Sequence, residues 1–409
     1  MTDVLFKNAL VLDPAAGELL PDRQVWVHDG RIKQVWDRPI KAAKAQVIDL
    51  KGRVLMPGLI DCHVHVTAAT ADFAALMRWS PFYVGARTAD ILRAMLRRGF
   101  TTVRDAGGAE YGIAQAVEEG YYEGPRVLFA GKALSQTGGH GDMRGRGESV
   151  LDACFCCPGL GRIVDGVDEI RRACRDEIRK GATHIKLMVS GGVASPTDRI
   201  GNTQFSVDEI TAAVEEAEAA EIHVMAHAYT ARAVNRALKC GVRSIEHGNL
   251  MDDSSADLFL ARDAFLVPTL ATYRALADEG VAAGMPKHLH AKVFSVLDQG
   301  IEALELAHKR GLRIAYGTDL LGIMHRHQLN EFALRSEVQK PIDIIRGATT
   351  VAAQLMGREG EIGAVTAGAR ADLLVVDGNP LRNVGVLQKP ETHLKAIMKD
   401  GKFFKNDLG

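Results

Sequence analysis

The sequence predicts an α/β protein: a closed (β/α)8 TIM-like barrel with a small composite β-sandwich that both ends of the chain contribute. Short apolar segments alternate with amphipathic helical segments through the middle of the chain, which is the pattern of a parallel sheet with crossover helices. β-Rich segments separated by turn residues occupy both ends, which indicates a second, smaller unit. We expect the sandwich from 1–56 and 363–409 and the barrel from 57–362. An open, doubly wound sheet is the alternative reading of the same alternation.

Composition limits the classes of function. The 409 residues are 47% hydrophobic and 25% charged, as in an ordinary globular protein, and the net charge is -1. This charge argues against a general nucleic-acid or anionic-membrane partner. The N-terminus lacks a secretory pattern, and no uninterrupted apolar run is long enough to span a bilayer. We therefore expect a cytoplasmic protein that binds neither nucleic acid nor membranes.

The cysteines do not indicate a structural metal site. Cys154, Cys156 and Cys157 lie together in CFCCPG, but no second cysteine pair completes four ligands at the usual spacing. Reduced thiols are the expectation for a cytoplasmic protein.

The terminal β unit is expected from short, alternating segments. The dipeptides Asp29-Gly30, Lys51-Gly52 and Asp400-Gly401 give the turns of hairpins. The expected strands are 4–12, 24–27, 32–36, 54–56, 372–376 and 395–399. Since they come from both ends of the chain, the two ends should meet in space.

The barrel is expected from eight strand candidates separated by helices. The strands are 59–66, 101–105, 127–134, 183–189, 223–227, 244–247, 265–269 and 313–318. The helices include 88–98, 167–180, 207–220, 231–240 and 287–310. Ser206 and Glu209 form a capping box, and glycines stand where helices should stop, at Gly99, Gly181, Gly241 and Gly311.

The first barrel strand carries the strongest chemical signal. It reads MPGLIDCHVHVT, so His63 and His65 are two residues apart and point to the same face of a strand. Two imidazoles side by side make half of a transition-metal site. A pair of histidines on a solvated face is the alternative, but the apolar neighbours indicate a buried strand, and buried imidazoles need partners.

Further polar residues stand at the ends of other strands, where a barrel collects its chemistry. Lys186 lies on the fourth strand, and the rest of this set are His227, His247, Asp319 and, in the loop after the third strand, His140. Lys186 could be a salt-bridged structural lysine. Flanked by metals, however, it could lose its proton, add carbon dioxide and become an anionic carbamate bridge.

These motifs together resemble the amidohydrolase superfamily: PGLIDCHVH, the strand-four lysine, AHA, EHG and GTD. The resemblance covers nearly the whole chain and implies its binuclear branch. Two divalent metal ions, most commonly Zn²⁺, would be held by His63, His65, His227, His247 and Asp319, with N-carboxylated Lys186 as the bridge. TGGHGD, AHAY and GTDLLGIMHRHQ are similar to prolidase-like Xaa-amino-acid carboxypeptidases, related to imidazolonepropionase. A glutamate that the superfamily's mononuclear deaminases carry after the strand-five histidine is absent, which argues against deamination.

The resemblance implies catalysis by Asp319 as a proton shuttle and by His140, which would donate to the carbonyl oxygen. Tyr229 faces the same side of its strand as His227 and is the candidate for a substrate carboxylate. Its alternative role is packing at the barrel rim. Arg144 and Arg146 are further carboxylate candidates, and His325 and His327 are candidates to line the pocket.

The expected function is release of a C-terminal L-amino acid from a dipeptide or N-acyl amino acid, including N-acyl-phenylalanine amides of the ochratoxin type. A cyclic amide or imidazolone hydrolase of the same superfamily is one alternative, and a non-catalytic scaffold is another. Six costly polar groups converging in a core argue against the scaffold. The resemblance also implies a homo-oligomer, with an octamer as one such assembly.

Overall fold

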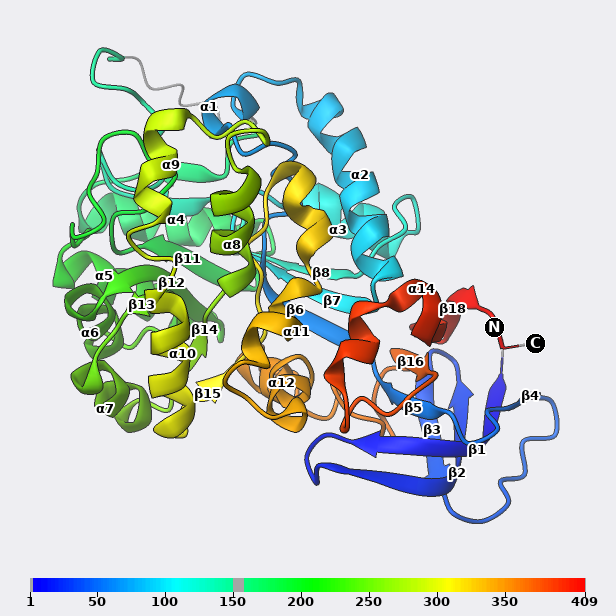
Figure 1. The fold of residues 1–409 in the computed structure, drawn as a ribbon. Coiled ribbons are helices and arrows are strands. Elements are labelled where there is room, and N and C mark those ends of the chain that lie inside the picture. The colour runs from blue at the N-terminus through cyan, green and yellow to red at the C-terminus, as the bar shows by residue number, and fades with distance from the viewer. Residues whose placement is uncertain (1–2, 150–157, 409) are drawn as a thin grey trace.

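The computed structural model describes residues 3–149 and 158–408, whose strands form three sheets (Figure 1). Two of the sheets are parallel. The three-stranded one has the order β6-β7-β8, with β6 (Leu59–Val64), β7 (Phe100–Asp105) and β8 (Arg126–Phe129). The seven-stranded one has the order β10-β9-β11-β12-β13-β14-β15, with β10 (Gly161–Ile163), β9 (Ala133–Ser135), β11 (His184–Met188), β12 (His223–Thr230), β13 (Ser244–Leu250), β14 (Phe265–Val267) and β15 (Arg313–Ile314). The chain is therefore a mixed α/β protein.

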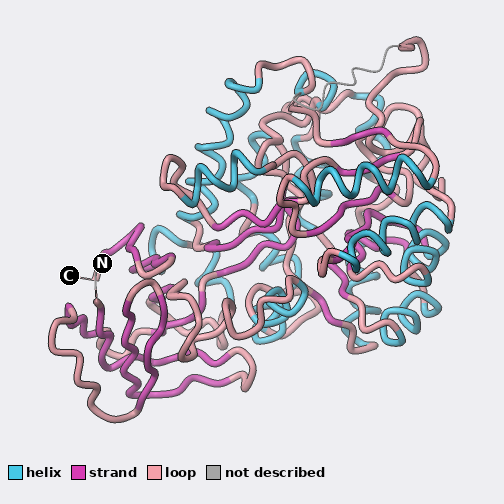
Figure 2. The backbone as a smooth tube through the Cα atoms, turned by 180° about the vertical axis from the view of Figure 1, so that it is seen from behind, coloured by secondary structure: helices cyan, strands magenta, loops and turns pink. Residues whose placement is uncertain are grey.

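Backbone hydrogen bonds join the two parallel sheets at both sides. The amide of Cys62 in β6 donates to the carbonyl of Tyr316, just after β15, at 2.7 Å. On the other side, the amide of Thr183, just before β11, donates to the carbonyl of Phe129 in β8 at 2.9 Å. β6 consequently lies beside β15 and β8 beside β11, and helices surround the two sheets (Figure 2).

The helices of the larger body include the expected 167–180, 207–220 and 231–240, each one residue shorter at its end, and 88–98, which begins earlier, at Pro81. They are α1 (Phe73–Leu76), α2 (Pro81–Arg97), α3 (Tyr111–Glu118), α4 (Val167–Arg179), α5 (Val207–Ala219), α6 (Ala231–Lys239), α7 (Asp253–Ala261), α8 (Leu270–Glu279), α9 (Lys287–Val293), α10 (Gln299–Lys309), α11 (Asn330–Arg335), α12 (Pro341–Gly347) and α13 (Thr350–Leu355), with a 3-10 helix η1 (Gly322–His327). The capping box of Ser206 and Glu209 is present at the start of α5. The expected helix-stopping glycines have left-handed φ angles, from 72° at Gly311 to 97° at Gly241.

Two expected elements are each split in the structure. The expected strand 127–134 is β8 and β9, which belong to different sheets. Between them Gly131 has φ 75°, and a Cβ atom there would lie 2.1 Å from Glu177 Oε2, so the chain turns where only glycine fits. The expected helix 287–310 is α9 and α10. Between them the carbonyl of Val296 accepts a hydrogen bond from the Asn249 side chain at 2.8 Å.

Strands from both ends of the chain share the third sheet, as expected. It has the order β18-β17-β16-β5-β1-β2-β3, and β4 pairs with β1. Its strands are β1 (Val4–Asp13), β2 (Glu18–His28), β3 (Arg31–Trp36), β4 (Gln46–Asp49), β5 (Val54–Pro57), β16 (Leu373–Val376), β17 (Leu394–Lys399) and β18 (Lys402–Asn406), with η2 (Val384–Gln388) and α14 (Pro390–His393) between β16 and β17. β5 lies parallel to β1 and antiparallel to β16, so it joins the first and last segments of the chain (Figure 1).

The structure also bears on membrane-spanning helices and on the cysteines. Among the described residues, no helix combines the length and apolar character needed to cross a bilayer. Cys62, Cys174 and Cys240 are free thiols, whereas Cys154, Cys156 and Cys157 lie outside the described residues.

Candidate active site

A cavity of about 190 Å³ lies at the carboxyl ends of the parallel strands. It brings together nine of the predicted site residues: His63, His65, His140, Arg144, Lys186, His227, Tyr229, His247 and Asp319. His325 is buried but is not part of this lining, and its Nε2 lies 3.2 Å from the carbonyl oxygen of Ala68. His327 lies beside Glu279, to which its ring is hydrogen-bonded.

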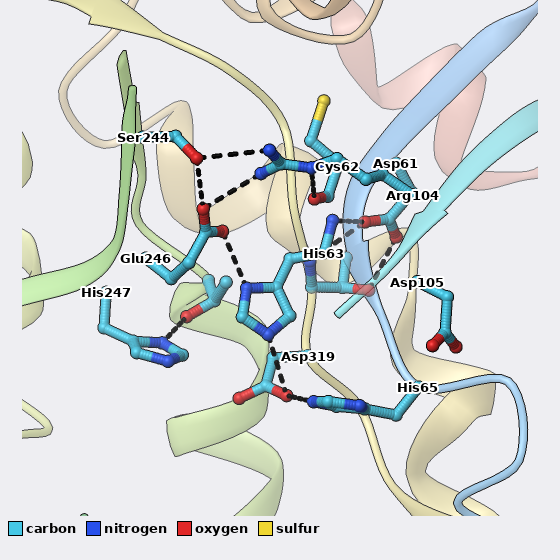
Figure 3. A network of polar contacts seen from close by, with 12 residues as sticks. Asp61, Cys62, His63, His65, Arg104, Asp105, Ser244, Glu246, His247 and Asp319 are labelled. Carbon is cyan, nitrogen blue, oxygen red and sulfur yellow. Dashed lines mark hydrogen bonds and ion pairs between the residues drawn. The ribbon is translucent and has the colours of Figure 1, made fainter. Parts of the chain in front are cut away.

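His63, His65 and Asp319 form the first ligand group. Asp319 Oδ1 lies 3.4 Å from His63 Nε2 and 3.2 Å from His65 Nε2 (Figure 3). One potential ligand atom from each residue falls within 4.8 Å of the others, which fits the coordination sphere of a single metal ion. Burial raises the pKa of Asp319, but His63 and His65 outweigh this effect and hold it well below its usual range.

His227 and His247, the predicted ligands of a second metal ion, line the same cavity, and so does Lys186. The rings of His227 and His247 have centroids 4.7 Å apart, and the ring of His247 lies 5.1 Å from that of His63. Lys186 is 1% exposed. Burial lowers the pKa of its ammonium to about 8, although the negative charges of Glu246 and Asp319 act to raise it.

Each of the four histidines has one ring nitrogen already engaged. His63 and His65 donate through Nδ1 to Glu246 and to the Gly107 carbonyl, at 2.8 and 2.7 Å. His247 Nδ1 lies 2.7 Å from Thr269 Oγ1, and His227 donates through Nε2 to the Gly191 carbonyl at 3.1 Å. One nitrogen per ring therefore remains as a ligand, and an engaged opposite nitrogen is the usual arrangement of metal-binding histidines. The donor set fits two divalent metal ions.

Glu246 and Arg104 form a buried ion pair behind His63, which the sequence analysis did not identify. Glu246 accepts from Arg104 at 2.9 Å and from Ser244 at 2.7 Å, and Arg104 also donates to the Cys62 carbonyl (Figure 3). Burial raises the pKa of Glu246, but Arg104 and His63 outweigh this effect and hold it well below its usual range. The Glu246 carboxylate thus fixes the ring orientation of His63 and makes it a stronger ligand.

Glu246→Gln tests this support. We expect metal affinity at the first group to fall by roughly 10- to 100-fold, because the amide holds His63 less strongly and leaves Arg104 without its counter-charge. Competition with a chromophoric chelator measures that affinity. Glu331→Gln is the matched control, since Glu331 is also fully buried but its carboxyl group accepts from the Ala271 amide instead of a site histidine. Equal metal affinity in Glu246→Gln and the wild type would contradict the assignment.

His247 explains why Glu246 was missed. Neighbouring residues on a regular strand face opposite sides, so a glutamate directly before a cavity histidine is expected to face away. His247 has φ 75°, a left-handed conformation that breaks this alternation. As a result the side chains of both Glu246 and His247 lie beside His63. The Glu-His dipeptide is the signal, but its meaning depends on this backbone conformation.

Two tyrosines line the cavity beside His227 and His247. Tyr229 packs against His227 with ring centroids 4.7 Å apart, and Tyr273 on α8 donates to the Tyr229 hydroxyl at 3.0 Å. Burial raises the pKa of Tyr229, so its hydroxyl stays protonated and can donate to a bound anion. Tyr273 was not identified from the sequence, because its segment shows only an ordinary helical pattern.

The predicted arginines differ in their surroundings. Arg144 lies at the cavity with its guanidinium against the carboxylate of Asp142, at 2.6 Å and 2.9 Å. Arg146 is not part of the cavity lining. Arg144 therefore reaches the cavity already paired with an anion, which reduces its capacity to hold a substrate carboxylate.

Comparison with known proteins identifies the family. The amidohydrolase family profile matches residues 54–404. The ochratoxinase of Aspergillus niger is 33% identical over 412 residues, which cover 97% of this chain and 85% of that protein. The imidazolonepropionase of Nocardia farcinica is 26% identical over 390 residues, covering 89% of this chain and 88% of that protein.

Solved structures agree with these sequence matches. A prolidase complexed with N-methylphosphonate-L-proline is 50% identical with a TM-score of 0.96, and the match covers 99% of this chain and 100% of that one. A Xaa-Pro dipeptidase with bound methionine in its active site is 27% identical with a TM-score of 0.89, with 99% and 100% coverage. The chain therefore belongs to the amidohydrolase family, and it is a hydrolase that acts on amide or peptide bonds.

Proposed function

We propose that the protein is a binuclear metal-dependent hydrolase that releases a C-terminal L-amino acid from dipeptides or N-acyl amino acids. The observation that carries this proposal is the cavity itself, in which two groups of metal-ligating side chains flank the buried Lys186. Similarity to a prolidase with a bound proline phosphonate, and to an ochratoxinase, supports an amide substrate with a C-terminal amino acid.

His63, His65 and Asp319 would hold one divalent ion, and His227 and His247 the other. Lys186, carboxylated on Nζ, would bridge them. Its pKa of about 8 supports this role, because only the neutral amine adds carbon dioxide. Two such ions, most commonly Zn²⁺, supply hydroxide near neutral pH and polarise the scissile carbonyl.

The residues of the chain supply the proton transfers and the orientation of the substrate. Asp319 takes the proton of the attacking water and passes it to the leaving nitrogen, because an amide nitrogen leaves poorly unless it is protonated. His140 contacts the carbonyl oxygen as negative charge develops on it. Tyr229 donates its hydroxyl to the substrate's C-terminal carboxylate.

The remaining lining of the cavity favours an apolar substrate side chain or acyl group. It includes Phe73, Met77, Leu160, Leu276 and Leu321. Apolar surface stabilises a bound apolar group by roughly 25 cal/mol per Å² removed from water. Proline, phenylalanine and methionine residues would all suit this lining.

Release of free amino acid from a substrate library tests the proposal. The zinc-loaded protein is incubated with dipeptides and N-acyl amino acids, and the products are identified by mass spectrometry. We expect turnover only of substrates with a free C-terminal carboxylate, and the matched C-terminal amides serve as controls. Equal turnover of the amides would contradict the role of Tyr229, and no turnover at full metal loading would contradict the proposed function.

Hydrolysis of a cyclic amide or imidazolone is the second candidate. The similarity to the imidazolonepropionase of Nocardia farcinica favours it. Such a substrate does not require a tyrosine for a C-terminal carboxylate, so Tyr229→Phe should then leave turnover unchanged. An assay that monitors ring opening of a cyclic substrate by its ultraviolet absorbance distinguishes this candidate from the first.

We also propose the domain boundaries and the closure of the barrel. The hydrogen bonds at both sides of the two parallel sheets support one closed (β/α)8 barrel over 57–362. Residues 1–56 and 363–409 would form the second domain as a β-sandwich. Assembly into a homo-oligomer stays a prediction, which light scattering in solution would test.

A further inference from the structure

The segment after β11 holds His140 through two buried polar side chains. His140 Nδ1 lies 2.9 Å from Ser195 Oγ, and the Ser195 hydroxyl is hydrogen-bonded to Asp198 Oδ1. Ser195 is fully buried, and the Asp198 side chain is 1% exposed. The cavity lining of the described residues includes His140 but neither Ser195 nor Asp198. These two residues can therefore act on a substrate only through His140.

The donors around Asp198 determine which way the hydrogen bonds run. Oδ2 accepts from the Gln204 side chain at 2.9 Å and from the Gly192 amide at 3.2 Å, and the Lys292 ammonium lies 3.3 Å from Oδ1. A carboxylate matches this set of donors, and a carboxylate only accepts. Ser195 must then donate its single proton to Asp198. Its oxygen is left to accept from His140, so the His140 ring carries a proton on Nδ1.

Other contacts pack against the faces of the His140 ring, in addition to the contact of Ser195 with its Nδ1 edge. One contact is the ring of His227, which stacks on it with centroids 4.3 Å apart at 25°. Another is Gly192, where a Cβ atom would lie 2.0 Å from His140 Cε1. The His140 amide also donates to Gln204 at 2.9 Å. Packing alone would allow the ring to turn over by 180°, and the contact with Ser195 selects one of the two orientations.

We propose that Ser195 and Asp198 are positioning residues for the hydrolysis, because the hydrogen bonds from Nδ1–H to Ser195 and from Ser195 to Asp198 fix which edge of the His140 ring faces the cavity. This inference rests on the proposed function. Lys292 on α9 contacts the backbone of this segment as well as the Asp198 carboxylate. Its ammonium donates to the carbonyl oxygens of Ser195 and Asp198, at 2.9 and 3.0 Å, and so anchors the backbone of the segment.

Asp198→Asn and Ser195→Ala test the proposal. The asparagine introduced by Asp198→Asn has the size of the aspartate. Both Asp198 oxygens face hydrogen-bond donors, so the NH₂ group that replaces one of them must face a donor. We expect kcat to fall by roughly 100-fold in both variants, as for the loss of one group that stabilises a transition state, while KM stays within about threefold. Metal content and melting temperature should remain those of the wild type. Ser195→Thr keeps a hydroxyl at the same atom and should recover most of the rate.

Thr197→Val is the matched control, because Thr197 lies in the same segment and its buried hydroxyl has no hydrogen-bond partner among the described residues. Wild-type kcat in both Ser195→Ala and Asp198→Asn would overturn the proposal. So would a loss in Ser195→Ala that is accompanied by a lower melting temperature and a lower metal content, because disruption of the segment would then explain it. The wild type is assayed first on the substrate library, so that absence of any turnover there counts against the proposed function instead of this inference.

Discussion

Lys186→Ala should lose both tight metal binding and turnover. The two ligand groups flank this side chain, and an alanine leaves no anion to bridge two cations in a buried site. Loss of several kcal/mol of charge stabilisation corresponds to a rate lower by roughly 10³-fold or more. Elemental analysis of the purified variant and amino-acid release on the preferred substrate measure the two effects.

Lys186→Arg tests whether the carbamate or only the positive charge of the lysine matters. Arginine keeps the charge but cannot add carbon dioxide at neutral pH. It should fail as completely as alanine. Lys180→Ala, which removes a lysine that pairs with Asp176 on α4, is the control and should keep both metals. A Lys186→Ala protein with two bound metals and wild-type turnover would refute the bridging role.

Asp319→Asn should slow turnover severely while the fold and much of the metal remain. The asparagine keeps the size of the side chain but cannot take a proton from water at neutral pH. We expect kcat to fall by roughly 10²- to 10⁴-fold, the usual contribution of a positioned general base. His63 and His65 remain to hold the first ion, so metal content falls less than in Lys186→Ala.

Product release at fixed reaction times and the metal content are measured on the same preparation to check this result. Asp298→Asn, a substitution of an exposed aspartate outside the cavity lining, is the control. If Asp319→Asn turned over near the wild-type rate, another group would have to move the proton.

The gathering of the four predicted ligand histidines around one cavity was predictable from the sequence because it depends on local periodicity. A strand alternates with a period of two, so the spacing of His63 and His65 alone places both on one face. Parallel strands end on one side of the fold, which brings His227 and His247 to the same place. These rules need no knowledge of the partner strands.

The supporting network was not predictable, because its members meet only in three dimensions. Arg104 reaches Glu246 from another sheet, and Ser195 meets His140 from a loop. The backbone at His247 departs from strand geometry, which reverses the expected facing of Glu246. The break at Gly131 was missed for a related reason, since a side chain of α4, Glu177, occupies the space that a Cβ would need.

The sheet shared by the two ends of the chain has a consequence for biosynthesis. β5 lies between β1 and β16, so its second neighbour is made only after the whole catalytic body has been translated. At roughly 5 to 20 residues per second, this leaves one edge of β5 unpaired on the ribosome for tens of seconds. An exposed edge strand of this kind invites pairing with other chains. A ribosome-stalled or C-terminally truncated chain should therefore be a target for chaperones, and its aggregation should be relieved by supplying residues 363–409 as a separate peptide.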